Sequence, residues 1–181
     1  MADATLFKRL NDNDPTLTAL ELNECDIDTV GEAILNNCFL ERIELLHSSP
    51  ISTQFLESLQ SVSSLRHLQL QSVGLSSSTA KALSLSLHTN LVTLNLSDNP
   101  KLGPRGCRDL VFPKLLRTLE LQNVSMGHFG AQALSLPTAC LVSLNIANND
   151  IQHDGLWKLI EQLHLLQHLR ELNVSFNNIL D

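Results

Sequence analysis

The sequence predicts an α/β solenoid, in which a parallel sheet forms the concave face and helices form the convex face. Three observations lead to this fold class. A phrase of the form leucine–x–x–leucine–x–leucine occurs seven times in the 181 residues. The first leucines of successive copies lie 23, 25, 26, 25, 25 and 28 residues apart, a period typical of solenoids. Most copies are followed by a segment with leucines at the three- and four-residue steps of a helix.

The repeated phrases are expected to form the strands. Their leucines alternate with polar residues, the pattern of a strand with one buried face. Leu94, Leu119 and Leu144 hold the fourth place in three adjacent copies and should stack in one buried ladder. The copies begin at Leu17, Leu40, Leu65, Leu91, Leu116, Leu141 and Leu169.

Helices are expected between the phrases, because parallel strands need a crossover on the opposite layer. A small residue near the start of most helices predicts a close approach between helix and strand. Prolines and glycines should make the fourth helix, roughly Arg105–Val111, the shortest. The small residues are Gly31, Ala80, Gly106, Gly130 and Gly155, and the other expected helices are Thr29–Asn37, Thr53–Leu59, Ser78–His88, His128–Leu134 and Asp154–Leu166.

The two ends of the repeat array differ. Residues 1–16 are expected to form an N-terminal capping helix and turn, with Leu6, Phe7 and Leu10 covering the core of the first repeat. Residues 17–181 hold the seven repeats, the last of which is incomplete. Because nothing covers the final strand at Leu169–Val174, we expect that the natural chain continues, that a second copy docks there, or that the terminal residues fold back, and continuation is favoured.

With these phrases the chain resembles leucine-rich repeat proteins over nearly its whole length. We call the ninth position of each copy, counted from its first leucine, the landmark position. Some copies carry valine there, as in LQLQSVGL and LELQNVSM, and others carry asparagine, as in LNLSDNPKL, LNIANNDI and LNVSFNNI. This alternation is similar to the ribonuclease-inhibitor-like subclass. The opening segment, Phe7–Glu24, is similar to the start of tropomodulin-type repeat domains.

Composition and motifs argue against several functions. Lys and Arg total 12 against 19 Asp and Glu, a formal charge of −7, so we expect no nucleic-acid partner. The sequence has no apolar stretch of membrane-spanning length and no signal peptide at its start, so we expect no membrane partner. Four cysteines without a CxxC pair then favour a cytoplasmic location.

Catalytic and metal-binding motifs are also missing from the sequence. It contains no G-x-S-x-G, P-loop, H-E-x-x-H or G-x-G-x-x-G motif. His164, His168 and Glu161 share one helix face, but a structural zinc site needs four ligands. The Ran GTPase-activating proteins share this kind of repeat, yet no residue here matches their catalytic arginine. We therefore expect no enzyme activity, no catalytic residues, no cofactor and no metal.

The remaining candidate site is the concave face, formed by the outward places of each phrase. A solvated sheet face is polar in any case, because one side of every strand meets water. Two features nevertheless favour binding: the side chains are mostly short or amides, and the charges gather in the first three repeats. The expected protein-binding residues are Glu21, Arg42, Glu44, Leu46, His67, Gln69, Asn95, Glu120, Gln122, Asn145 and Asn173.

The sequence thus favours a non-enzymatic protein–protein interaction module that binds a partner on its concave sheet face. Two alternatives stay open: a recognition fragment of a larger sensor or regulatory protein, and a tropomodulin-like cytoskeletal binder. Trp157 is expected to pack into the core, with a binding hot spot on the convex face as the other hypothesis for this residue.

Overall fold

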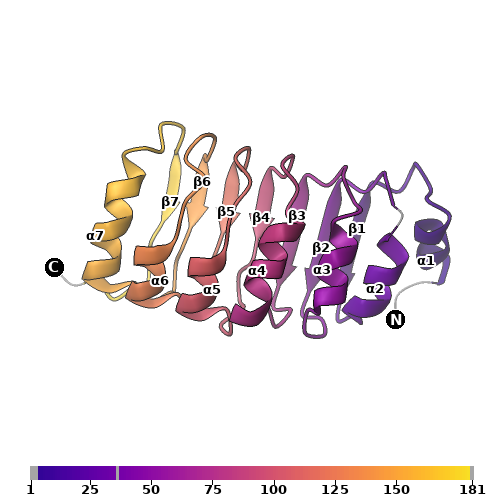
Figure 1. Ribbon diagram of the computed structural model, residues 1–181, viewed down its shortest axis with the longest axis horizontal. Coiled ribbons are helices and arrows are strands. Elements are labelled where there is room, and N and C mark those ends of the chain that lie inside the picture. Colours follow the sequence, from indigo (N-terminus) through magenta and orange to yellow (C-terminus); the bar gives the residue numbers. More distant parts are fainter. Residues whose placement is uncertain (1–3, 36, 180–181) are drawn as a thin grey trace.

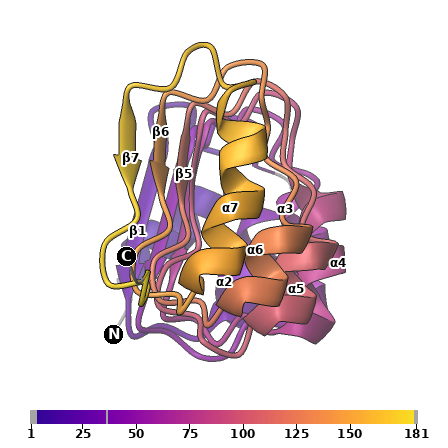
Figure 2. The same cartoon turned by 90° about the vertical axis from the view of Figure 1, so that its left-hand side faces the viewer.

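The computed structural model describes residues 4–35 and 37–179, and within them the chain forms two stacked layers (Figure 2). One layer is an open sheet of parallel strands, ordered along the sheet as they are in the sequence. The other is a row of helices on one side of that sheet (Figure 1). This arrangement confirms the predicted α/β solenoid.

Strands and helices alternate throughout the described residues. The strands are β1 (Ala19–Asn23), β2 (Arg42–Leu46), β3 (His67–Gln71), β4 (Thr93–Asn95), β5 (Thr118–Glu120), β6 (Ser143–Asn145) and β7 (Glu171–Asn173). The helices are α1 (Ala4–Asn11), α2 (Ile27–Ile34), α3 (Thr53–Leu59), α4 (Ser77–Ser86), α5 (Gly103–Asp109), α6 (Gly127–Ala133) and α7 (Gln152–Leu163).

The leucine columns build the core between the two layers. Leu94 pairs with Leu119 and Leu119 with Leu144 in the register of the sheet, and all three are buried. The predicted ladder is therefore confirmed. Each such leucine has neighbours in the repeats on both sides, so the hydrophobic stabilisation is distributed along the array.

The helix positions are close to the prediction, but most bounds shift towards the N-terminus. Only α3 matches its expected range, while the others begin and end one or more residues earlier. The early ends have a common cause in α5 and α6: the next residue, Leu110 or Leu134, turns to an extended conformation and is buried. The helix of the fourth repeat, α5, shares the shortest length among the described helices with α3 and α6, since all three have 7 residues.

The small residues at the helix starts serve a different contact from the predicted one. A Cβ added at Gly130 would lie 3.1 Å from Pro104 Cα, and one at Gly155 would lie 3.0 Å from His128 Cα. These neighbours belong to the preceding helix, not to a strand. The prediction of helix-to-strand approach was wrong, and the glycines instead allow adjacent helices to pack closely.

The N-terminal helix α1 covers the first repeat. Leu10 is buried, and Leu6 and Phe7 pack against the core. Arg9 Nε donates to Asp14 Oδ2 over 2.6 Å, which ties α1 to the turn that follows it. At the other end of the described chain, β7 has one neighbouring strand, β6, and Leu172 is 42% exposed.

A column of polar side chains links the turns that follow the strands. Asn149 Oδ1 accepts from the backbone N–H groups of Val124 and Met126, in the preceding repeat. Its amide group donates to three carbonyls, those of Leu121, Ile146 and Ala147. One buried asparagine therefore satisfies buried backbone groups in two repeats.

Within this column, each repeat with valine at the landmark is followed by a repeat with asparagine there. Asn99 Oδ1 accepts from the N–H groups of Val73 and Leu75, as Asn149 does from the fifth repeat. In the second repeat, two hydroxyls take over this role, since Ser48 Oγ accepts from Cys25 N–H and Ser49 Oγ from Ile27 N–H. The turn N–H groups of repeats with valine or cysteine at the landmark thus donate to side-chain oxygens of the next repeat along the chain.

Candidate functional site

The sheet register brings the predicted concave residues into columns. Glu21, Glu44 and Gln69 lie directly across from one another on β1, β2 and β3. The same column continues through Asn95, Glu120, Asn145 and Asn173 on β4 to β7. Neighbouring positions place Arg42 beside His67 and Leu46 beside Gln71.

The charged residues of β1 and β2 form a compact group. Two carboxylates facing each other across strands repel. Here Arg42 Nη1 lies 2.9 Å from Glu44 Oε1, so the guanidinium offsets the repulsion between Glu44 and Glu21. Among the described residues, the Glu21 carboxylate has no hydrogen-bond or ion-pair partner, and it is exposed. This carboxylate is therefore available to a ligand.

His67 and Leu46 add a neutral and an apolar element to the same area. His67 Nδ1 lies 3.1 Å from Thr93 Oγ1. Burial, together with the nearby Arg42 charge, lowers the pKa of His67 below its usual 6.5. The imidazole is consequently neutral at neutral pH and supplies hydrogen bonding there. Leu46 is half-buried at the end of β2, and its exposed part offers a small apolar contact.

The concave residues of the last four repeats form more hydrogen bonds within the protein. The side-chain oxygens of Asn95, Asn145 and Asn173 each accept from the backbone N–H two residues further on, over 2.9 to 3.1 Å. Asn145 Nδ2 also donates to Glu120 Oε2 over 2.7 Å and to Gln122 Oε1 over 3.3 Å. These five predicted residues therefore bond largely to one another and to their own backbone.

Sequence reasoning missed Asp98, which links three repeats next to this face. Its carboxylate accepts from Gln71 Nε2 over 2.8 Å and from Asn123 Nδ2 over 2.9 Å. Its backbone is left-handed, with φ of 59°. The sequence did contain a signal for this role, namely an acidic residue directly before the landmark Asn99. From that position, the Asp98 side chain can reach both adjacent repeats.

Groups that could support chemistry are dispersed. Among the described residues, no three His, Cys, Asp or Glu side chains come together in a way that could hold a metal ion. Burial raises the pKa of the Cys107 thiol to about 12, so it is protonated at neutral pH and is a poor nucleophile. His164 and His168 both lie exposed near the end of α7 and the loop beyond it.

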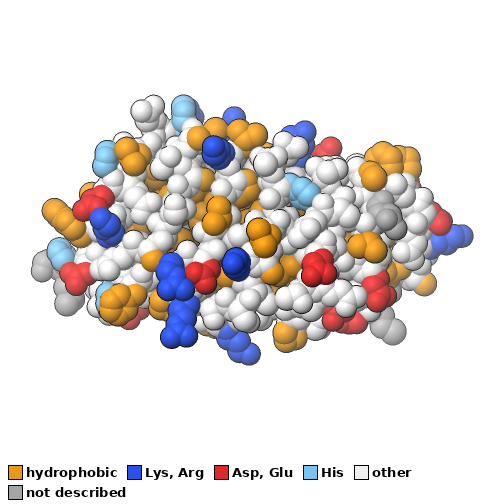
Figure 3. All heavy atoms as spheres, viewed as in Figure 1, with side chains coloured by type: hydrophobic (Ala, Val, Ile, Leu, Met, Phe, Trp, Pro, Cys, Tyr) orange, Lys and Arg blue, Asp and Glu red, His pale blue; other side chains and the backbone are white. Residues whose placement is uncertain are grey.

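The helix-bearing face carries exposed apolar side chains and clusters of charge (Figure 3). Trp157 is 63% exposed, so the prediction that it packs into the core was wrong. Phe129 on α6 is 67% exposed. None of the described helices combines the length and the apolar character needed to cross a bilayer.

Comparison with known proteins supports the repeat assignment. Four segments match the family model described as "Leucine Rich repeat": residues 13–31, 87–111, 139–159 and 166–181. Each of them includes one of the strands in the sheet. No curated protein matches the chain.

Proposed function

We propose that this leucine-rich repeat protein binds a protein partner on the concave face of β1 to β3, without catalysing a reaction. Leucine-rich repeats are in general protein–protein interaction modules and are typically non-enzymatic. The partner and the face are our inference from the side chains on the sheet.

The observation that supports this proposal is a difference in the internal hydrogen bonds that the concave side chains form. Asn95, Asn145 and Asn173 bond to their own turns, whereas Glu21 has its carboxylate exposed without a partner among the described residues. Binding a ligand to β1 to β3 therefore disrupts fewer internal hydrogen bonds than binding it to β4 to β7. We define the N-terminal trough as Glu21, Arg42, Glu44, Leu46, His67 and Gln69.

The charges of this trough favour a basic partner. Glu41 and Glu24 lie exposed beside Glu21 and Glu44, while Arg42 already pairs with Glu44. Complementary charge raises the association rate and disfavours acidic competitors. A lysine- or arginine-rich surface with one apolar side chain near Leu46 fits this arrangement.

Charge reversal tests the proposal. Proteins from the source cell are captured on the wild type and on the double variant Glu21→Lys/Glu44→Lys, and each captured protein is then titrated in purified form by calorimetry. The variant should bind the partner about tenfold more weakly at low salt, because attraction becomes repulsion. Its thermal midpoint should stay close to that of the wild type, since both side chains lie on the solvent side of the sheet.

The matched control is Glu32→Lys/Glu57→Lys, which changes net charge equally through exposed residues of α2 and α3. It should bind as the wild type does. Equal affinities for the wild type and the trough variant at low salt would contradict the assignment of Glu21 and Glu44 to the interface.

The other hypotheses from the sequence stay predictions. A recognition fragment of a larger sensor or regulatory protein and a tropomodulin-like binder both use the same repeats, and actin co-sedimentation tests the second. The ribonuclease-inhibitor-like subclass likewise stays a prediction. Self-association through the C-terminal repeat would use the exposed Leu172, and light scattering over a range of protein concentrations tests it.

A further inference from the structure

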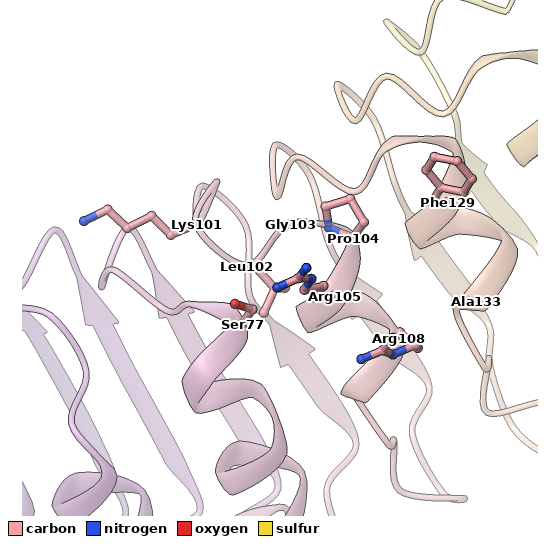
Figure 4. Close-up of a pocket in the computed structure, with 9 residues that line it drawn as sticks. All are labelled: Ser77, Lys101, Leu102, Gly103, Pro104, Arg105, Arg108, Phe129 and Ala133. Atoms are coloured by element: carbon pink, nitrogen blue, oxygen red, sulfur yellow. The ribbon is translucent and has the colours of Figure 1, made fainter.

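A second surface with ligand-binding character lies on the helix layer, around the start of α5. It is an open hollow of about 550 Å³. Figure 4 shows that its lining comes from three successive repeats, with α5 between the start of α4 and α6. The residues that matter for its chemistry are Ser77, Lys101, Arg105, Arg108, Phe129 and Ala133.

The hollow is positively charged in a protein whose formal net charge is −7. Lys101, Arg105 and Arg108 all line it, and all three are exposed. Arg108 Nε lies 3.0 Å from Asp109 Oδ1, but within the described chain no carboxylate lies within ion-pair distance of Lys101 or Arg105. At least two cationic groups are therefore left for an external anion.

One wall of the hollow is apolar. Phe129, at the start of α6, is 67% exposed and contacts only the adjacent imidazole of His128 among the aromatic rings of the described residues, with ring centroids 4.0 Å apart. A large aromatic side chain in water gains stability when a ligand covers it. In Figure 4, Phe129 stands on α6 on the side of Pro104, and the two arginines extend from α5 towards α4.

Close helix packing keeps these walls in place. At Gly130, an added Cβ would lie 3.1 Å from Pro104 Cα, and at Gly106 it would lie 3.3 Å from Ser77 Cα. The three helices around the hollow are thus in close contact at their starts. A preformed site of this kind requires little ordering on binding, which favours affinity.

We propose that this hollow, the α5 pocket, binds an acidic segment of another protein that carries one apolar side chain. The carboxylates of the segment pair with Arg105, Arg108 and Lys101, and its apolar side chain covers Phe129. Arginine is suited to this role because its planar guanidinium pairs with a carboxylate through two parallel hydrogen bonds. The pocket lies on the layer opposite the N-terminal trough, so this proposal does not depend on the concave-face proposal.

Protein is favoured over other polyanions by the overall charge. Nucleic acids and anionic lipid surfaces extend far beyond three cations, and they would meet the remaining acidic surface of a chain with net charge −7. A short acidic segment meets only the local cations. The Phe129 ring also calls for a single apolar side chain, which a peptide supplies.

Fluorescence anisotropy with labelled peptides tests the proposal. The probe is a short peptide of glutamates around a central leucine, and it is compared with two peptides of equal length. One has lysines in place of the glutamates, and the other has serine in place of the leucine. The glutamate–leucine peptide should bind, more weakly as salt increases, and the lysine peptide should not.

Two variants locate the binding. Arg105→Glu/Arg108→Glu should weaken the glutamate–leucine peptide about tenfold, with Arg105→Gln/Arg108→Gln as a milder form that adds no new carboxylate. Phe129→Ala should weaken the leucine peptide and leave the serine peptide unchanged. The matched control is Lys81→Glu/Lys114→Glu, which gives the same net charge from exposed lysines outside the pocket and should have little effect.

Three results would overturn the proposal. One is equal weakening by the control and the arginine variant, which would mean a general effect of net charge. Another is equal binding of the serine and leucine peptides. The last is tighter binding, through the same arginines, of an oligothymidine or of phosphatidylserine vesicles. Glu21→Lys/Glu44→Lys should bind the peptide as the wild type does, so failure here is distinguishable from failure of the concave-face proposal.

Discussion

The first three repeats and the last four present the same leucine columns to the core, but their strands differ in length. β1, β2 and β3 each have 5 residues, whereas β4 to β7 each have 3. At the last position of the shorter strands, Asn95, Asn145 and Asn173 bond to the backbone N–H two residues on. At the same place, β1 to β3 carry glutamate or glutamine, whose longer side chains do not close this turn.

This difference shows that one residue type, asparagine, determines both strand length and surface chemistry. An asparagine that closes a turn ends the regular ladder and withdraws its own oxygen from solvent. β5 ends at Glu120 although it has a glutamate, because both neighbouring strands turn at their asparagines. Longer strands and exposed carboxylates therefore occur together in the first three repeats.

The largest expected effect tests whether the two regions share one core. Leu68→Ala in the first region and Leu119→Ala in the second should each lower the free energy of unfolding by about 2–5 kcal/mol, since the surrounding leucines cannot fill the cavity. Both leucines are buried, and Leu68 lies in register with Ile43 and Leu94 as Leu119 does with Leu94 and Leu144. Urea denaturation measures the loss. A loss below about 1 kcal/mol at one site alone would mean that the two cores are not equivalent.

The next prediction compares how strongly the two regions depend on the polar side chains that link their turns. Asn149→Ala leaves the buried N–H groups of Val124 and Met126, and three carbonyls, without this partner, and should cost about 2–4 kcal/mol. Ser48→Ala, at the corresponding place in the second repeat, should cost about 1 kcal/mol, because it removes fewer bonds. Denaturant midpoints give both values. Equal losses would show that the second repeat depends on its hydroxyl as strongly as the sixth depends on its amide.

A smaller effect tests the turn-closing role of asparagine. Asn95→Gln should cost about 0.5–1.5 kcal/mol, because the longer side chain cannot accept from Ser97 N–H in the same turn. Asn95→Asp keeps the accepting oxygen and serves as the matched control, with little expected change. Thermal unfolding compares the two. If Asn95→Gln were as stable as the wild type, the turn would not explain the short strands.

The smallest effect concerns the N-terminal cap and depends on pH. Hydrogen bonds from Arg9 and Thr16 lower the pKa of Asp14 from 3.8 to about 2. The carboxylate therefore contributes stability that is fully present above about pH 4 and is lost as the pH falls towards 2. The protection of the α1 amides, taken as the measured exchange rate relative to the intrinsic rate at each pH, should fall over that interval in the wild type. In Asp14→Asn this pH dependence should be much reduced, and an unchanged profile would mean that other carboxylates control the cap.

The sequence predicts the periodic features well and the local ones less well. Leucine spacing determines the strands, their register and the core, because burial repeats with the same period. The helix bounds shift because buried residues such as Leu110 and Leu134 end the helices at the core. The helix-to-helix role of Gly130 depends on the packing angle between repeats, which a single repeat does not encode.

The positions of the concave side chains on the strands were predicted from the sequence, but their individual contacts were not. The concave positions follow from the period of the strands, and Glu21 and Glu44, both predicted on this face, lie directly opposite each other. The engagement of Asn95 and Asn145 depends on turn geometry after the strand, which the alternating pattern does not contain. The exposure of Trp157 was missed because its position in the helix was taken as inward-facing.

The column of turn side chains has a consequence for how this array can be copied or shortened. Asn99 serves the turn of the third repeat and Asn149 that of the fifth, whose own landmarks are valines. Removing the fourth repeat alone would place Val124 where Asn99 stood, and the amides of Val73 and Leu75 would have no acceptor. Removing the third and fourth together keeps every valine turn next to an acceptor of this kind. An asparagine repeat can also follow another, since Asn177 Oδ1 accepts from the N–H groups of Asn149 and Ile151. In the middle of this chain, a valine repeat can therefore be deleted alone or with its asparagine neighbour, whereas an asparagine repeat cannot be deleted alone.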